Sequence, residues 1–350
     1  MPITDITFQK REDDMVIATQ GRGFYVLNDL PLVRALAPRK VPQSEAYLFA
    51  PKSSYRYAGG RGDRLALGTG ANPPSGVVLY YSLETRADSE VKLRFLDASG
   101  KLIKEFSSVD DSDHAAPAAE GEERAPEVKL PVQAGLNRFL WDMRYTDATS
   151  FPGLILWASN LRGPLANPGT YTVELIANGQ TLKQTFVIKK DPRVSTTPEQ
   201  FSEQLEFELQ IRDRISLANQ TVIDIRQKKH DLASYTLGRI SDIAAKAQRI
   251  LDSLSDVENA IYQTKLQSTK DPLNFPVKLN NKLASLLNTV STSDSSPTSQ
   301  SYEVYKDISG QLQVQLDKLS RINTQYIGEL NQMLRKQNMP TISAADTKSM

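Results

Sequence analysis

The sequence predicts a multidomain protein that is β in its first half and α in its second, because the spacing of apolar residues changes once. Between residues 46 and 190, apolar and polar residues alternate in short runs separated by turn residues, which is typical of strands. After Asp191-Pro192-Arg193, apolar residues recur every three to four positions, as on one face of a helix. We therefore predict four parts: a β hairpin at 1–40, a β-sandwich at 46–190, a four-helix-type bundle at 195–338 and a flexible tail at 339–350.

The first part reads as two short strands around a glycine turn. Met15–Ala18 and Phe24–Leu27 are apolar and rich in β-branched or aromatic residues, and Gly21 and Gly23 flank Arg22 at the reversal. One hairpin is at best marginally stable in water. We therefore expect these residues to dock on the sandwich or to form a poorly packed sheet edge that is open to pairing.

The second part contains roughly seven short strands with turn signals between them. Val77–Leu83 is the strongest strand, and Asn178-Gly179 is the strongest hairpin turn. The remaining predicted strands are Ala46–Phe49, Val91–Asp97, Leu102–Phe106, Gly135–Asp142, Tyr171–Ile176 and Thr181–Ile188. Strands of this number and spacing favour an immunoglobulin-like sandwich.

Two loops interrupt these strands. The acidic, Ala/Pro-rich loop at 110–126 lacks the alternating ligands of a calcium loop, so we interpret it as a solvated loop. The loop at 146–168 is apolar in its middle, and we expect it to pack against the sandwich. Within it, Trp157 fits a packing role, and the alternative is that its ring stacks on a sugar or a partner. Arg162 in the same loop is the second candidate for a ligand or partner contact.

The third part begins with a helix-start signal at Thr197-Pro198-Glu199-Gln200, where Thr197 caps and Gln200 lies three residues on. Four apolar stripes at helical spacing follow. Their members are Phe207, Ile211, Ile215, Ala218, Val222 and Ile225; Ile240, Ile243, Ala247, Ile250, Leu254, Val257 and Ile261; Leu279, Leu283, Leu286 and Val290; and Tyr305, Ile308, Leu312, Leu316, Leu319, Tyr326, Leu330 and Met333. Such stripes with short connections predict an antiparallel helical bundle.

Composition excludes several classes of function. Lys and Arg number 42 against 41 Asp and Glu, so there is no charge-based case for a nucleic-acid or membrane-surface partner. The chain has no cysteine and two histidines, His114 and His230, which leaves few residues for thiolate or histidine chemistry. We interpret His230 as a solvated or capping residue at a helix end. No apolar run is long enough to span a membrane, and the start at Met1 is unlike a signal peptide. We predict no cofactor, no metal and no catalytic residue.

Several stretches nevertheless resemble one family. Residues 13–30, DDMVIATQGRGFYVLNDL, resemble the last repeat of large bacterial β-propeller proteins related to sortilin and to sialidase (BNR) repeats, many of which are assigned to the glycosyl hydrolases. This resemblance implies that residues 1–40 are a remnant of the last propeller blade. GLNRFLWDMRY and NPGTYTVELIANGQTLKQTFVIKKDPR resemble the sandwich that follows the propeller, which is similar to the Ig-like module of flagellar hook-capping proteins. DPLNFPVKLNNKLASLLNTV resembles the helical region after it.

The resemblance implies a C-terminal region, because the Asp-box turns of the propeller are missing from the sequence and no catalytic residue of the family maps onto it. It implies a non-catalytic accessory or scaffold region that supports or presents a propeller, which lies in a longer chain or a homologous subunit. We expect the chain to be a fragment or a truncated gene product of an exported, periplasmic or extracellular protein. Two alternatives remain open. One is a sialidase-like glycosyl hydrolase with its active site in the propeller, and the other is a carbohydrate- or protein-binding module.

Overall fold

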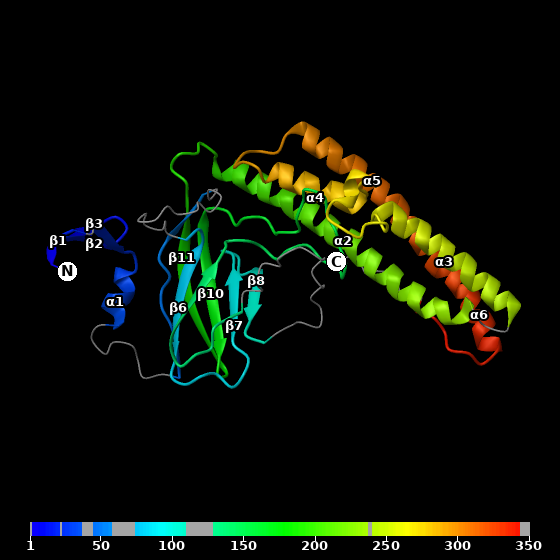
Figure 1. Cartoon of the computed structure of the whole chain (residues 1–350), viewed down its shortest axis with the longest axis horizontal. Helices are drawn as coiled ribbons and strands as arrows, with labels where there is room; N and C mark the ends of the chain where they lie inside the picture. Colours follow the sequence, from blue (N-terminus) through cyan, green and yellow to red (C-terminus); the bar gives the residue numbers. More distant parts are fainter. Residues whose placement is uncertain are drawn as a thin grey trace. The chain divides into compact units, whose positions relative to one another are not determined.

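The structure, a computed structural model, describes residues 2–21, 23–36, 45–57, 74–109, 129–236 and 240–343 of the 350-residue chain. The chain divides into two compact units, which we call the β unit and the helical unit (Figure 1). The β unit takes Met1–Asp110, Val128–Met143 and Pro168–Pro192, and the helical unit includes Arg144–Asn167 and Arg193–Met350. The order β then α is as the sequence predicts. The loop expected at 110–126 lies outside the described residues.

The chain starts with a three-stranded antiparallel sheet, which we call the N-terminal sheet. Its strands are β1 (Ile3–Gln9), β2 (Asp14–Thr19) and β3 (Gly23–Leu27), with β2 in the middle. A short helix, α1 (Leu30–Leu36), follows. The predicted hairpin is confirmed as β2 and β3, with Gly21 at φ 87° and Gly23 at φ 79°. Sequence reasoning missed β1 because polar Thr4, Asp5 and Thr7 dilute its apolar pattern.

Two further sheets make up the rest of the β unit. A three-stranded antiparallel sheet has the order β4-β6-β9, and a five-stranded sheet has the order β5-β11-β10-β7-β8. All neighbours in the larger sheet are antiparallel except β5 and β11, which are parallel. The bounds are β4 (Ala46–Leu48), β5 (Ser54–Arg56), β6 (Val77–Leu83), β7 (Lys92–Leu96), β8 (Leu102–Ser107), β9 (Gly135–Trp141), β10 (Gly169–Ala177) and β11 (Gln180–Lys190).

Local sequence accounts for the hairpins and for the core of these two sheets. Asn178 (φ 49°) and Gly179 (φ 73°) close the β10–β11 hairpin, in the left-handed region that these two residue types tolerate best. Side chains of the two sheets meet where the Phe95 ring of β7 stacks on Trp141 of β9, with ring centroids 4.2 Å apart. Both rings are fully buried, so the aromatic alternation of the strands fills one shared core.

The helical unit is built of α-helices that range from 9 to 39 residues in length. Its elements are α2 (Pro198–Thr236), α3 (Ser241–Ile261), the 3₁₀ turn η2 (Asp271–Leu273), α4 (Leu279–Val290), α5 (Ser299–Arg321), the π-helical turn η3 (Ile322–Ile327) and α6 (Gly328–Lys336). The predicted start of α2 is confirmed as a capping box. The Thr197 backbone N–H donates to Oε1 of Gln200 at 2.9 Å, and the Gln200 N–H donates to Oγ1 of Thr197 at 3.3 Å.

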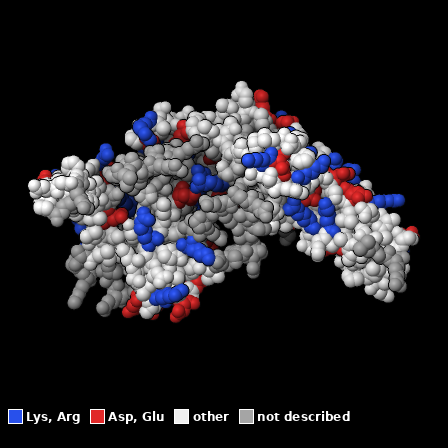
Figure 2. All heavy atoms as spheres, viewed as in Figure 1, with Lys and Arg blue, Asp and Glu red and all other residues white. Residues whose placement is uncertain are grey.

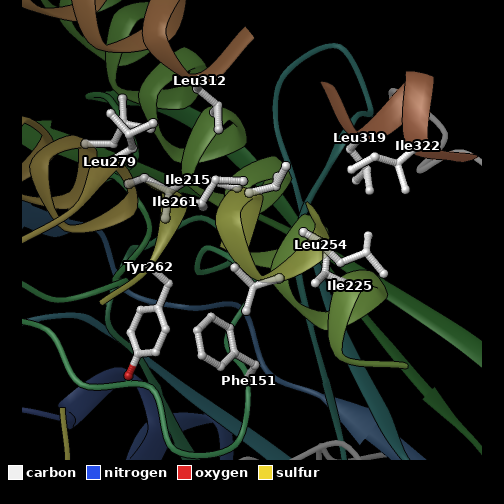
Figure 3. Packing of buried hydrophobic residues seen from close by; sticks show 14 of the residues in the cluster. Phe151, Ile215, Ile225, Leu254, Ile261, Tyr262, Leu279, Leu312, Leu319 and Ile322 are labelled. Carbon is white, nitrogen blue, oxygen red and sulfur yellow. The ribbon is translucent and has the colours of Figure 1, made fainter. Parts of the chain in front are cut away.

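The apolar stripes of the first three predicted helices are buried in one core, apart from Ile240, which precedes α3 and is exposed. Figure 3 shows a part of this core. The fourth stripe needs a correction. Tyr326 is 38% exposed, whereas Ile327 is fully buried. The step of five residues from Ile322 to Ile327 would leave the buried face of a regular α-helix, and the π-helical turn over these residues brings Ile327 back to it.

Two end-of-helix expectations also change. His230 is exposed as expected, but α2 continues six residues beyond it to Thr236, so it caps no helix end. The predicted flexible tail begins at 339, yet Ile342 is buried at 4% exposure. Its backbone N–H and C=O both pair with the side-chain amide of Asn331, each at 2.8 Å. Residues 344–350 lie outside the described part of the chain.

Candidate functional site

The first candidate is the segment 144–167, which we call the strap. It leaves the β unit after β9 and returns to it before β10, but it belongs to the helical unit. Ala148 and Phe151 are buried in the helical core, and the Phe151 ring lies beside that of Tyr262, with centroids 5.1 Å apart (Figure 3). The expectation that this loop packs on the sandwich is therefore wrong for Ala148 and Phe151. Their apolar character predicted burial without saying against which unit.

Side chains of α2 and α4 bind the beginning of the strap. The Asn219 amide donates to the Thr149 carbonyl at 2.7 Å, and Oγ of Ser216 accepts from the Thr149 N–H at 3.1 Å. Asn280 donates in turn to Oδ1 of Asn219 at 3.1 Å. Asn219 and Asn280 are almost fully buried, so these polar groups satisfy one another and the strap backbone inside the helical core.

The middle of the strap is held by Tyr262 and Arg226. The Tyr262 hydroxyl donates to the Gly153 carbonyl at 3.0 Å and accepts from the Ile155 N–H at 3.3 Å. Burial of this hydroxyl raises the pKa of Tyr262 above its ordinary value. Arg226 donates from Nη1 to the Pro152 carbonyl at 3.3 Å. A backbone without secondary structure thus finds its hydrogen-bond partners on the helices.

Trp157 is fixed through its backbone and presents its side chain. Its N–H donates to Oδ1 of Asn281 at 2.6 Å, and its carbonyl accepts from Nδ2 of the same residue at 3.2 Å. Asn281 is buried, whereas Trp157 is 39% exposed. Ser159 and Ser285 share a hydrogen bond of 2.7 Å next to them. The predicted packing role of Trp157 is thus only partly met, and the exposed part of the ring is available for stacking on a ligand.

Arg162, the other predicted contact residue, lies five positions further along the strap and is exposed. Its backbone N–H donates to Oδ1 of Asn160 at 3.0 Å. The next residue must be glycine, because a Cβ on Gly163 would lie 2.1 Å from the Tyr145 carbonyl oxygen. The backbone next to Arg162 is therefore packed closely against that of Tyr145 and Thr146.

Sequence reasoning missed the asparagines that hold the strap. The signal was present, since Asn219 follows Ala218 of the apolar stripe and Asn280-Asn281 open α4. A polar residue on a buried helix face needs a partner. Helical periodicity offers no means of placing that partner in the loop at 146–168, more than fifty residues away.

The second candidate is the N-terminal sheet, because it is apolar on both faces. Cross-strand partners share a face, so one face carries the row Ile6, Ile17 and Tyr25, next to the row Phe8, Met15 and Leu27. The opposite face carries Val16 with Val26 and Ala18 with Phe24.

Large side chains of the two edge strands, β1 and β3, are exposed, whereas those of β2 are half-buried. Phe24 is 78% exposed, Val26 56%, Phe8 52% and Ile6 47%. Phe24 and Val26 lie on one face of the sheet, and Phe8 and Ile6 lie on the other. Exposed apolar side chains gathered in this way make the N-terminal sheet a candidate interaction surface.

Charge does not single out a third candidate. Figure 2 shows basic and acidic groups next to one another over the helical unit. Among the described residues there is no group of three or more His, Asp or Glu side chains placed to hold a metal ion. No helix in the described part of the chain is long and apolar enough to cross a membrane.

Comparison with known proteins adds no relative. A scan against protein-family models and searches of curated proteins and of solved structures found no match to this chain.

Proposed function

We propose that this chain is a non-catalytic accessory or scaffold region of a sortilin-like or sialidase-like propeller protein. In this proposal the two larger sheets are an Ig-like sandwich and the helices an antiparallel bundle. The N-terminal sheet docks against sheets of the propeller, which lies in a longer chain or a homologous subunit. The observation that carries the proposal is the exposure of Phe8 on one face of that sheet and Phe24 on the other.

The N-terminal sheet needs a covering layer on each of its two faces. A sheet with one apolar face needs one covering layer, whereas a sheet that is apolar on both faces needs a layer on each side. Neighbouring sheets in a propeller supply two such layers at once. The resemblance of residues 13–30 to a last propeller repeat points to the same partner, and it comes from the sequence alone.

The test is binding to a separately expressed propeller of the sortilin-like class, measured by calorimetry. We expect binding by the wild-type chain and at least a tenfold loss in Phe8→Asp and Phe24→Asp, because each substitution places a charge on one of the two faces. Leu273→Asp is the matched control, since Leu273 is 71% exposed on the helical unit. Equal binding by all four proteins contradicts the proposal.

The same samples separate the scaffold from the enzyme alternative. Turnover of fluorogenic sialosides by the chain alone contradicts a non-catalytic role. Turnover only in the mixture with the propeller assigns the chemistry to the propeller.

The second candidate function is a carbohydrate- or protein-binding module, and Trp157 favours it. Its backbone N–H and carbonyl are both held by Asn281 while the residue is 39% exposed, which suits a preformed stacking platform. A glycan array with wild type and Trp157→Ala tests it. Hits that disappear in the variant support this function, and an array without hits counts against its carbohydrate form.

A further inference from the structure

A pocket in the helical unit contains two basic side chains around one buried acid. It is lined by Arg226 and Lys229 of α2, by Ser255, Glu258 and Asn259 of α3, and by Thr264 beyond the end of α3. Its volume is about 400 Å³, and it opens to solvent. It does not involve the N-terminal sheet or Trp157.

Glu258 holds the two basic side chains in place. Nε of Arg226 lies 2.8 Å from one carboxylate oxygen, and Nζ of Lys229 lies 3.0 Å from the other. The Glu258 side chain is only 4% exposed. The carboxylate is therefore engaged on both oxygens and screened from a ligand, and its role is to orient the two cations.

Arg226 is fixed from two further sides. Its guanidinium lies over the Phe151 ring at 4.7 Å and over the Tyr262 ring at 5.4 Å. Nη1 donates to the Pro152 carbonyl of the strap. Such a guanidinium loses little conformational freedom when it binds a ligand.

Donors remain for a ligand after these contacts are made. Nη2 of Arg226 has no acceptor among the described residues, and Lys229 uses only one of its three N–H groups there. Oδ1 of Asn259 accepts a hydrogen bond from the Thr264 hydroxyl. The Nδ2 donor of Asn259 therefore points away from Thr264. Donors of this kind on two cations and an amide suit an oxyanion.

We propose that this pocket binds the carboxylate group of a small molecule. The two cations and Glu258 leave a net charge of one positive unit, which a monocarboxylate neutralises and a phosphate dianion exceeds. The planar fork of Arg226 also matches a carboxylate, and Lys229 supplies a point charge beside it.

The experiment titrates sodium acetate into the full chain at constant ionic strength and follows the backbone amide and Asn side-chain signals by NMR. We expect saturable shifts at Ser255, Asn259 and Thr264, with sodium phosphate binding more weakly than acetate. Lys229→Gln should weaken acetate binding at least tenfold, and Lys229→Arg, which keeps the charge, should retain it. Lys306→Gln is the matched control, since Lys306 is an exposed lysine of α5.

Three results overturn the proposal. The first is the absence of saturable shifts in the wild type, which leaves Arg226, Lys229 and Glu258 as a structural clamp on the strap. The second is equal acetate binding in Lys229→Gln and wild type. The third is tighter binding of phosphate than of acetate, which contradicts the assignment of a carboxylate.

Discussion

The N-terminal sheet and the two larger sheets of the β unit have similar strands and different surroundings. In β6, buried and half-buried residues alternate along the whole strand, and Val77 and Leu79 are fully buried. In β1 every residue is exposed, although Ile6 and Phe8 are as apolar as the residues of β6. In both regions neighbouring strands are joined by backbone hydrogen bonds.

This difference teaches that strand pairing and burial are separate contributions to stability. A paired strand exchanges hydrogen bonds with water for hydrogen bonds with its neighbour, at a small net gain. The large favourable term comes from removing apolar side chains from water. The larger sheets obtain that term from each other, whereas the N-terminal sheet leaves side chains such as Phe8 and Phe24 largely in water.

The largest expected effect on stability comes from a substitution in the core between the two larger sheets. Trp141→Ala should lower the free energy of unfolding by about 3–5 kcal/mol, because it removes a fully buried ring stacked on Phe95. Phe24→Ala should change it by less than about 0.5 kcal/mol, since that ring is already in water. Urea denaturation followed by far-ultraviolet circular dichroism measures both. Comparable losses in the two variants contradict the comparison.

A smaller effect tests how buried hydrogen bonds hold the strap, which has no regular secondary structure. Asn281→Ala should cost about 1–3 kcal/mol, because the Trp157 N–H and carbonyl lose their shared partner beside the helical core. Asn288→Ala is the control, since Asn288 is only half-buried and its amide donates a longer bond of 3.3 Å, to the Ala158 carbonyl. Equal unfolding midpoints for the two variants would show that the Asn281 bonds contribute nothing to holding the strap.

The pH dependence of stability also reports on burial, here of tyrosine hydroxyls. Burial raises the pKa values of Tyr262 in the helical unit and Tyr81 in the β unit. The folded state keeps these protons at pH values where the unfolded chain has lost them. Stability should therefore fall as the pH rises above about 10, the ordinary tyrosine value.

Tyr262→Phe separates the contribution of Tyr262 to this effect. The variant loses both bonds to the strap and should be less stable than wild type at neutral pH. Its unfolding midpoint should also fall less steeply above about pH 10, as measured by urea titrations across that range. An unchanged slope would mean that the Tyr262 proton is not held by the fold.

The smallest effect concerns the N-terminal residues themselves. Deleting residues 1–40 should leave the remaining units folded with cooperative melting. The contacts of these residues with the rest of the β unit include partly exposed polar pairs, such as the Lys52–Asp14 ion pair at 2.7 Å and the Tyr80–Asp29 hydrogen bond at 2.6 Å. Such contacts contribute about 0–1 kcal/mol each. Loss of cooperative melting by calorimetry would show that the N-terminal sheet is part of the core.

Local signals in the sequence predicted much of the fold. The Asn178-Gly179 turn and the Thr197 capping box follow from residue types within a few positions of one another. The period change after Asp191 located the switch from strands to helices, because each period reflects the geometry of its own backbone.

What could not be predicted depends on residues far apart in the sequence. The strap binds Asn219, Tyr262 and Asn281, which lie more than fifty residues beyond its end in the sequence. The burial of Ile327 in place of Tyr326 depends on a π-helical turn, which no helical periodicity of 3.6 residues indicates. For the candidate site, the sequence named Trp157 and Arg162, but the groups that fix Trp157 became visible only in the structure.

Hydrogen exchange of the backbone amides tests the central claim most directly, because it compares the N-terminal sheet with the larger sheets in one sample. In the isolated chain, amides of β1, β2 and β3 should exchange much faster than those of β6, β7 and β10, since few buried side chains oppose the opening of the N-terminal sheet. Addition of the propeller should slow exchange in β1, β2 and β3 and leave β6, β7 and β10 unchanged. Equal protection of the two sets in the isolated chain would contradict the account, because the N-terminal sheet would then be stable without a partner.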